Sequence, residues 1–322
     1  MARPESVPVV LAAAQTDPGR KRDLNEDSVS YELMPYGGVF VVADGMGGHR
    51  TGEVASRLAV DHITANLRQD SPSPQNLVKA FEAANREIYT AGQAPESRGM
   101  GTTATALWLD LPYAILGHVG DSRAYLYRKG EMVQLTNDHS WVAERVRQGV
   151  LTEAEARNHR WRNVITNALG SFPQVRVDLI GLKVEPGDLF LLCSDGLTSV
   201  LDDPVIAEVL RNYPPEQAVP RLIALANEWG GPDNISVLVA AVGPHVPAQQ
   251  RPYALAVEAA KGGPVNLQLG QEPEGVTTQV IEPERPRGFW RRWSNWLLLL
   301  LWGGLLAYVL YSQFGPGKPI NP

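Results

Sequence analysis

The sequence is poor in the residue types that build disulfides, zinc sites and nucleic-acid surfaces. It has one cysteine, Cys193, and six histidines in 322 residues. A single cysteine excludes an intramolecular disulfide and a cysteine-based zinc site, so a bound metal would depend on carboxylates or imidazoles. Lysine and arginine together number 29, against 35 aspartates and glutamates, which gives a net charge of −6. This shortage of positive charge argues against nucleic acid as a partner, because phosphate-backbone binding needs clustered basic residues.

Long apolar runs are also missing until near the end of the chain, where residues 296–311 carry no charge. A hydrocarbon core of about 30 Å needs about 20 helical residues. A buried helix of a globular domain is the alternative, but such a helix is rarely apolar on every face. Arg291 and Arg292 precede the run and Lys318 follows it, so the positive-inside rule places the preceding chain in the cytoplasm. We therefore predict a single-pass protein of the cell membrane, with a transmembrane helix at 289–314 and a short extracytoplasmic tail at 315–322.

Proline is concentrated between residues 244 and 288, which contain seven of the 25 prolines. Proline interrupts helices and central strands, because it lacks a backbone N–H and fixes φ. We therefore predict a flexible linker at 244–288, which would join a soluble domain at 1–243 to the membrane.

Within residues 1–243 the hydrophobic pattern indicates both helices and strands. Helical spacing of apolar residues predicts helices at 51–68, 76–91, 141–148, 152–158 and 215–228. Apolar runs between turn residues predict strands at 9–14, 39–43, 104–109, 113–118, 124–127, 132–135, 188–193 and 235–242. Helices that occur in pairs between runs of strands indicate an α+β fold with antiparallel sheets and helices packed outside.

Acidic residues recur at the ends of these predicted strands, and glycine accompanies most of them. The positions are Glu26-Asp27, Asp44-Gly45, Gly120-Asp121, Asp195-Gly196 and Asp233-Asn234. Each pair alone is equally consistent with an ordinary turn or a solvated loop. If they converge, their carboxylates repel one another and their pKa values rise unless cations neutralise them. Ligands that are all oxygen favour Mg²⁺ or Mn²⁺, and two such ions can activate a water and clamp a phosphoryl group.

Six short segments resemble, in the same order along the chain, the motifs of the metal-dependent serine/threonine protein phosphatases (PPM family, type 2C). They are Arg22 with Glu26-Asp27, Asp44-Gly45-Met46-Gly47-Gly48, Gly101-Thr102-Thr103, Gly120-Asp121-Ser122-Arg123, Ser194-Asp195-Gly196 and Gly231-Pro232-Asp233-Asn234. The resemblance covers about residues 8–243, and the motifs are similar to those of the bacterial members of the family. It implies a four-layer fold, in which an antiparallel β-sandwich is flanked by helix pairs.

The resemblance also implies a metal-ligand set. Asp44 would bridge two divalent cations, Mn²⁺ or Mg²⁺, and the carbonyl of Gly45 would bind one of them. Asp195 and Asp233 would bind the other. Asp121 and Asp195 would hold a third, weaker metal.

Other matched residues would act around these metals. Arg22 would bind the substrate phosphate, for which a planar guanidinium is suited. Glu26 and Asp27 would hold metal-bound waters, and Asn234 would lie with them in the layer of residues behind the ligands. Met46 stands where eukaryotic members have a histidine that is a candidate general acid, so no side chain is expected to fill that role here.

The resemblance implies hydrolysis of phosphoserine and phosphothreonine monoesters by a metal-activated bridging water. The partners would be phosphoproteins, among them a membrane serine/threonine kinase and its substrates. The alternative is a regulatory phosphoprotein-binding domain, or a sporulation-type signalling phosphatase, with one dedicated partner.

Overall fold

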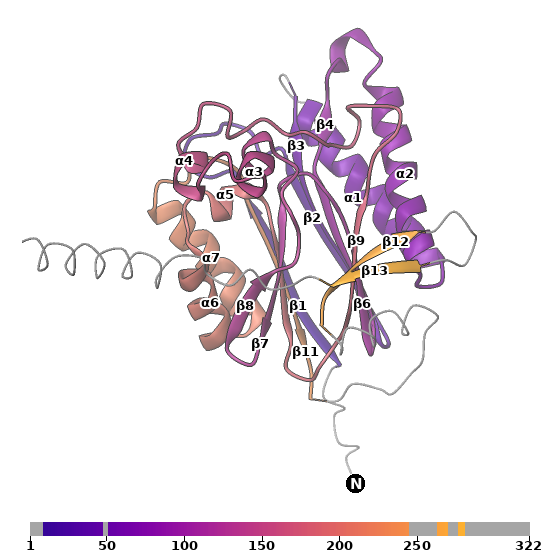
Figure 1. The fold of residues 1–322 in the computed structure, drawn as a ribbon, viewed down its shortest axis with the longest axis vertical. Helices are drawn as coiled ribbons and strands as arrows, with labels where there is room; N and C mark the ends of the chain where they lie inside the picture. The colour runs from indigo at the N-terminus through magenta and orange to yellow at the C-terminus, as the bar shows by residue number, and fades with distance from the viewer. Residues whose placement is uncertain (1–8, 48–50, 245–262, 270–275, 281–322) are drawn as a thin grey trace, which may run out of the picture. The chain divides into compact units, whose positions relative to one another are not determined.

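Two antiparallel β-sheets form the centre of the fold in the computed structural model, which describes residues 9–47, 51–244, 263–269 and 276–280 (Figure 1). The first sheet has the order β1-β11-β10-β7-β8, with strands Val10–Asp17, Ile235–Val242, Leu189–Cys193, Arg123–Arg128 and Glu131–Gln134. The second has the order β13-β12-β9-β6-β5-β3-β2, with strands Val276–Val280, Val265–Leu269, Asp178–Lys183, Tyr113–Val119, Ala104–Asp110, Gly37–Met46 and Asp27–Met34. A short strand β4, Gly101–Thr102, pairs with the end of β3.

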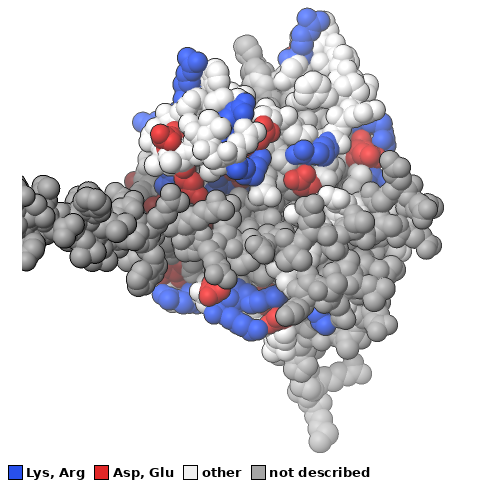
Figure 2. Space-filling model, in the orientation of Figure 1, with Lys and Arg blue, Asp and Glu red and all other residues white. Residues whose placement is uncertain are grey.

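Helices cover the outer face of each sheet (Figure 1). Helices α1 (Thr51–Gln69) and α2 (Pro74–Ala91) pack on the second sheet. Helices α5 (Asp195–Thr198), α6 (Asp203–Asn212) and α7 (Pro215–Glu228) pack on the first. Two short helices, α3 (Trp141–Arg147) and α4 (Glu153–Arg157), and a 3-10 turn at Pro95–Ser97 lie in the connections. Charged side chains of both signs are interspersed on the face shown in Figure 2.

Alternation along each central strand divides the apolar residues between an inner and two outer cores. In β3, Phe40 and Val42 face the opposite sheet, whereas Val39 and Val41 pack with α1 and α2. In β10, by the same alternation, Leu192 faces inward and Leu191 packs against the helices of the first sheet. Both faces of these strands are buried, which explains why they are continuous apolar runs in the sequence.

Most of the predicted elements are confirmed. Helix α7 and strand β11 have the predicted bounds, and other predicted strands and helices differ by a few residues at their ends. The turn between β7 and β8 is a tight hairpin, in which Lys129 and Gly130 have φ values of 52° and 90°. Helix α4 begins with a capping box between Thr152 and Glu155, as the sequence indicates. The α+β fold with two antiparallel sheets is therefore confirmed.

Besides the short β4, α5 and the 3-10 turn, three longer elements of the domain are absent from the sequence prediction, namely β2, β9 and α6. Strand β2 is only partly buried, and its alternation of Ser28, Ser30 and Glu32 with apolar residues is a strand pattern that the prediction did not use. Strand β9 is short and includes Gly181. Helix α6 follows Asp202 and has Pro204 in its first turn, a recognisable start signal that the prediction did not use.

Strands β12 and β13 lie inside residues 244–288, where the sequence predicts a flexible linker. At 265–269 this prediction is wrong, because β12 pairs with β9 and extends the second sheet. Val265 and Leu267 are buried in the core shared with α1 and α2, and their alternation with Asn266 and Gln268 is the strand pattern that Pro264 and Pro273 conceal.

No helix among the residues that the structure describes has the length and apolar character that crossing a membrane requires. The helix predicted at 289–314 and the tail predicted at 315–322 lie outside those residues, as does most of the predicted linker.

Candidate metal and phosphate site

The strands bring five aspartates together from distant parts of the sequence. Asp44 lies near the end of β3, directly opposite Asp27 of β2. Asp195 opens α5 immediately after β10, and Asp233 precedes β11, which is the neighbour of β10. Asp121 follows β6. The charges of the other four aspartates all help to raise the pKa of Asp44, so these residues form one group, named here the carboxylate cluster.

Burial and mutual repulsion raise the pKa values in the carboxylate cluster. At Asp27, Asp44, Asp121 and Asp195 burial is the largest cause of the rise in pKa, and neighbouring carboxylates add to it. The pKa of Asp44 lies well above its usual range, and those of Asp27, Asp121 and Asp195 rise to about 7, 8 and 6. Except for Asp27, the members of the cluster are half-buried and retain contact with solvent. The cluster therefore has an excess of negative charge that an entering cation would neutralise.

The main chain around Asp44 is fixed by two threonines. The Asp44 N–H donates to Oγ1 of Thr103 at 2.9 Å, and the Asp44 carbonyl accepts from the Thr103 N–H at 2.9 Å and from the Thr102 hydroxyl at 2.8 Å. At the next position a Cβ would lie 2.1 Å from the carbonyl oxygen of Gly52. Glycine is therefore required at position 45, because the helix α1 backbone approaches too closely for a side chain.

Arg22 is the basic side chain that contacts the cluster directly. Its Nη2 donates to Oδ2 of Asp233 at 2.9 Å, while Oδ1 of Asp233 accepts from the Asn234 N–H at 2.9 Å. The hydrogen bond and charge of Asp233 raise the pKa of Arg22 further. About half of the Arg22 side chain is exposed (51%), so its remaining N–H groups are open to a phosphate at the rim of the cluster.

Asn234 organises the loop that carries Arg22 and Glu26. Its Oδ1 accepts from the Glu26 N–H at 2.8 Å, and its Nδ2 donates to the carbonyls of Pro18 and Leu24 at 3.0 and 2.8 Å. All three bonds go to main chain. Asn234 therefore acts in this structure by holding the loop in place beside Asp233.

Two buried carboxylate oxygens, one in the cluster and one next to it, have no hydrogen-bond partner among the described residues, and they provide a test of whether a metal fits. They are Oε1 of Glu26 and Oδ1 of Asp27. The other oxygen of Asp27 accepts from the Ser194 hydroxyl at 2.7 Å. Buried acceptors without donors are costly, and the waters of a hydrated cation are donors. The orphaned oxygens, the oxygen-only donor set and the excess negative charge all fit divalent cations such as Mg²⁺ or Mn²⁺.

The carboxylates are not drawn together into a finished coordination shell. Within the described part of the chain, no group of three or more histidine, cysteine, aspartate or glutamate side chains is placed to hold a metal ion. A physical reason is visible at Asp233, because both of its oxygens are engaged, by Arg22 and by the Asn234 N–H. The ligand roles of Asp44, Gly45, Asp121, Asp195 and Asp233 therefore remain predictions.

His139 holds the loop that carries Asp121, a contact that the sequence analysis does not predict. Its N–H donates to the Gly120 carbonyl at 2.7 Å, and its ring Nδ1 accepts from the Gly120 N–H at 3.1 Å. Because Nδ1 is an acceptor, Nε2 carries the proton and donates to Oδ2 of Asp178 at 3.0 Å. Gly120 has φ +109°. The short spacing from Asp121 to His139 across one hairpin is the signal that could have indicated this contact.

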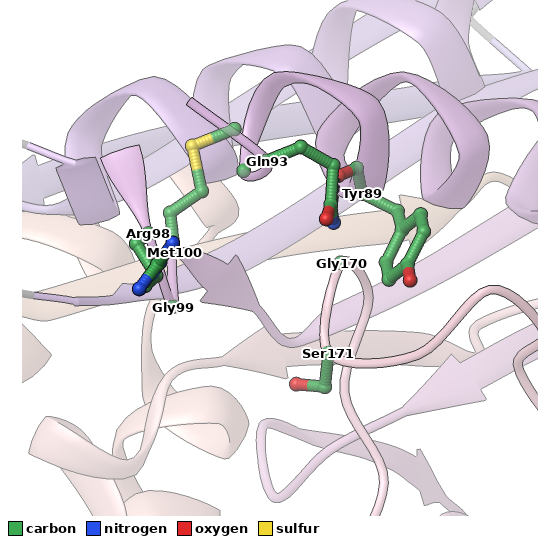
Figure 3. A pocket seen from close by; sticks show the side chains of 8 residues that line it. Tyr89, Gln93, Arg98, Gly99, Met100, Gly170 and Ser171 are labelled. Atoms are coloured by element: carbon green, nitrogen blue, oxygen red, sulfur yellow. Dashed lines mark hydrogen bonds between the residues drawn. The ribbon is translucent and has the colours of Figure 1, made fainter. Parts of the chain in front are cut away.

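A cavity of about 310 Å³ lies between the end of α2 and the turn at Gly170 and Ser171 (Figure 3). It is lined by Tyr89, Gly92, Gln93, Arg98, Gly99, Met100, Gly170 and Ser171. Figure 3 shows Tyr89 and Gln93 on α2 and Ser171 on the facing turn. No carboxylate lines this cavity, so its chemistry differs from that of the cluster.

Comparison with known proteins gives a consistent result. The family model described as "Protein phosphatase 2C" matches residues 18–226. The chain is 41% identical over 240 residues to the serine/threonine protein phosphatase PstP of Mycobacterium tuberculosis (strain H37Rv), covering 73% of this chain but only 45% of PstP. It is 38% identical over 229 residues to protein phosphatase PhpP of Streptococcus pneumoniae, covering 69% of this chain and 93% of PhpP. The chain thus spans less than half of PstP and nearly all of PhpP.

Solved structures agree with these relatives. The catalytic domain of PstP in complex with two manganese ions matches with a TM-score of 0.66 and 39% identity, over 73% of this chain and 99% of that one. The PPM Ser-Thr phosphatase MsPP of Mycobacterium smegmatis, in complex with cacodylate, matches with a TM-score of 0.67 and 36% identity. That match covers 74% of this chain and all of MsPP (100%).

Proposed function

The chain belongs to the bacterial protein phosphatase 2C family, and we propose that its residues 1–243 hydrolyse phosphoserine and phosphothreonine in proteins. The carboxylate cluster with Arg22 at its rim is the observation that carries this proposal. The cluster concentrates negative charge that divalent cations would neutralise, and the guanidinium is the group that best binds two oxygens of a phosphate.

Two divalent cations, Mn²⁺ or Mg²⁺, would be held by Asp44, the Gly45 carbonyl, Asp195 and Asp233. When bound, they would supply an activated water for in-line attack on the phosphorus and would stabilise the charge on the phosphoryl oxygens. Asp121 and Asp195 would hold a third, weaker ion. A manganese pair in the PstP structure supports manganese as the metal to test first.

The protein's own groups would bind the substrate and preserve the geometry of the site. Arg22 would bind phosphate oxygens through the N–H groups that Asp233 leaves open. Thr102 and Thr103 keep the Asp44 backbone in place, and the orphaned oxygens of Glu26 and Asp27 would accept hydrogen bonds from ordered water.

No side chain is assigned as the general acid. The ring of His139 contacts the loop that carries Asp121. Both of its ring nitrogens are already engaged, Nδ1 by the N–H of Gly120 and Nε2 by the carboxylate of Asp178. Met46 cannot donate a proton. We infer that the leaving alkoxide takes its proton from water, so the pH–rate profile should have no acidic limb that the substitution His139→Gln removes.

We further propose that residues 289–314 anchor the phosphatase in the cell membrane, with residues 1–243 in the cytoplasm and 315–322 outside. The uncharged run at 296–311 and the arginines before it support this placement. A membrane-bound serine/threonine kinase and its substrates would then be the natural source of phosphoproteins. A dedicated regulatory partner is the second candidate, supported by the length of chain that separates the domain from the anchor.

The experiment is turnover of p-nitrophenyl phosphate and of a phosphothreonine peptide with and without Mn²⁺. We expect turnover that requires the metal and that falls at least 1,000-fold, on the order reported for groups acting in the transition state, in Asp44→Asn. Circular dichroism would confirm that the variant is folded. A folded wild-type protein that hydrolyses neither substrate with any divalent metal would contradict the proposal and favour the regulatory alternative.

A further inference from the structure

The segment from His139 to Leu169, named here the flap, is fastened to the carboxylate cluster at both ends. At its start, the His139 N–H donates to the carbonyl of Gly120, next to Asp121. At its end, Leu169 exchanges two hydrogen bonds with Thr102, at 2.9 and 3.0 Å, and the Thr102 hydroxyl donates to the Asp44 carbonyl. The flap thus connects the Asp121 side of the cluster with the Asp44 side.

A further contact ties the middle of the flap to the first sheet's side of the cluster. Arg157 of α4 pairs with Asp202 at 3.0 Å, and Asp202 directly precedes α6, shortly after the α5 helix that Asp195 opens. A protein substrate with its phosphorylated residue in the cluster would therefore have neighbouring residues beside the flap.

The flap carries three aromatic rings in mutual contact. Trp141 stacks on His159 with ring centroids 4.9 Å apart, and Trp161 meets Trp141 edge-on at 4.6 Å and His159 at 5.7 Å. None of the three is buried, and Trp161 is 41% exposed. The rings belong to none of the apolar cores, so they form a surface feature and do not support the fold's interior.

Two arginines lie over these rings and a third is adjacent. The guanidinium of Arg145 lies 5.1 Å from the Trp141 ring centroid, and that of Arg160 lies 4.6 Å from the Trp161 centroid. Arg162 follows Trp161 and is exposed. None of these three arginines pairs with a carboxylate within the described residues, whereas Arg157 of the same flap does. A guanidinium that lies over an indole can still donate from its N–H edge, as Arg145 Nη1 does to Oε1 of Gln148 at 2.6 Å, and the ring holds it in position.

Charge complementarity identifies the ligand that this surface fits. Figure 2 shows several Lys and Arg side chains on the part of this face where α3 and α4 lie. Three guanidiniums without a carboxylate partner among the described residues attract acidic side chains of a bound protein. We propose that Arg145 and Arg160, which lie over Trp141 and Trp161, bind acidic side chains that flank the phosphorylated residue of a protein substrate, together with the adjacent Arg162. This inference rests on the proposed function and adds a substrate class to it.

The test compares two phosphothreonine peptides of equal length, one with aspartate and glutamate on both sides of the phosphothreonine and one with alanine and glutamine there. Full-length protein in detergent is assayed with Mn²⁺, as wild type and as the triple variant R145Q, R160Q and R162Q. The matched control is R86Q, R211Q and R221Q, which removes three arginines from α2, α6 and α7. Arg221 also lies over an aromatic ring, that of Tyr213.

We expect the wild type and the control to prefer the acidic peptide by about tenfold in kcat/KM, since each exposed ion pair contributes modestly. The preference should arise in KM and should weaken at high salt. The triple variant should lose it and keep wild-type turnover of p-nitrophenyl phosphate.

Three results would overturn the inference. The first is a wild type that does not prefer the acidic peptide, and the second is a triple variant that keeps the preference. The third is a triple variant whose turnover of p-nitrophenyl phosphate falls as much as its turnover of the acidic peptide, which would indicate a structural role. Binding of the wild type but not of the triple variant to anionic vesicles, with peptide preference unchanged, would assign the surface to lipid. Failure of the wild type to hydrolyse p-nitrophenyl phosphate is a different result, because it contradicts the proposed function itself.

Discussion

Arg22 occupies the position of a cation in the carboxylate cluster. It lies 2.9 Å from Asp233, one of the proposed metal ligands. A guanidinium neutralises one carboxylate but leaves the remaining repulsion between Asp44, Asp121 and Asp195 in place. Arg22 would therefore compete with a metal ion for Asp233, and its exposed N–H groups are available to bind the substrate phosphate at the rim of the cluster.

This double role predicts opposite effects of Arg22→Gln on metal and on substrate. The affinity for Mn²⁺, measured by titration calorimetry, should be unchanged or higher, because Asp233 is released. Turnover of a phosphopeptide should fall by about 10- to 100-fold in kcat/KM, since a charge-assisted hydrogen bond contributes about 1.5–3 kcal/mol. A large loss of Mn²⁺ affinity would contradict the account, and Arg22→Lys serves as the control that keeps the charge.

His118 is a buried residue whose titration should be visible in stability. Its Nδ1 contacts the Thr105 hydroxyl at 2.9 Å and its Nε2 the Asn137 carbonyl at 3.1 Å, so both nitrogens are bonded in the neutral form. Burial, followed by the neighbouring His139, lowers the pKa of His118 to about 4. The unfolded chain takes up a proton near pH 6.5, well before the folded protein does.

The contribution of His118 to the free energy of unfolding should therefore decrease as pH falls from about 6.5 to about 4. Above about pH 6.5 this contribution should stay constant. The loss should be about 3 kcal/mol over the whole range. Urea unfolding of the wild type and of His118→Gln, both with EDTA, would measure it. The difference between the two proteins should shrink as pH falls, and a difference that stays constant with pH would contradict the assignment.

At the scale of single residues, the sequence predicts which acidic residues form the site but not the residues that form hydrogen bonds with them or with their loops. The motif residues Asp44, Asp195 and Asp233 are found at strand ends, as expected, because apolar runs mark where those strands stop. The contacts of His139 with Gly120 and of Arg22 with Asp233 join residues far apart in the chain or across a turn. No periodic pattern records such contacts, since they depend on how the two sheets are placed against each other.

Elements with a continuous apolar pattern were predictable, and those at the margins were not. Helix α7 buries one face and has a regular spacing, so its bounds follow from the sequence. Strands β2 and β12 lie toward the edges of the second sheet. Edge strands bury less and tolerate polar residues, so the tertiary partner decides their structure.

A largely buried ion pair joins β7 to the residue that precedes β10 and to the end of β9. Arg128 of β7 donates to both oxygens of Asp188, at 2.8 and 2.6 Å, and to the carbonyl of Lys183 in β9 at 2.8 Å. The pair therefore links the two sheets. Asp188 is 1% exposed and Arg128 is 18% exposed, so the loss of Asp188 leaves a largely buried guanidinium with only the more exposed Glu185, at 3.3 Å, as a carboxylate partner.

Asp188→Asn should lower the free energy of unfolding by about 3 kcal/mol, as is usual for breaking a buried pair. Metal-dependent turnover at a temperature where the variant is folded should stay unchanged, because the pair contacts no member of the carboxylate cluster. Asp202→Asn is the matched comparison, since it breaks the exposed pair with Arg157 and should cost less than about 1 kcal/mol. Equal losses of stability in the two variants would contradict the conclusion that burial makes the Arg128–Asp188 pair costlier to break than the exposed Arg157–Asp202 pair.

For the whole molecule, composition and the apolar run at 296–311 predict a membrane-tethered domain. Removal of residues 289–322 should move the protein from the membrane fraction to the soluble fraction and leave kcat for p-nitrophenyl phosphate unchanged. A chain that lacks 263–322 should in addition be less stable, because it loses β12 and the buried Val265 and Leu267. Fractionation and thermal unfolding of the two truncations would separate these effects, and retention of the first truncation in the membrane would contradict the anchor.

The proposed hydrolysis requires cations that are held between carboxylates from both sheets. Diffraction from crystals soaked in MnCl₂, with anomalous differences collected near the manganese absorption edge, tests this directly. We predict two anomalous peaks that share Asp44, one bounded also by Asp195 and Asp233 and the other by the Gly45 carbonyl, with Arg22 displaced from Asp233. Soaked crystals that show manganese elsewhere, or no manganese between positions 44, 195 and 233, would contradict the proposed hydrolytic site.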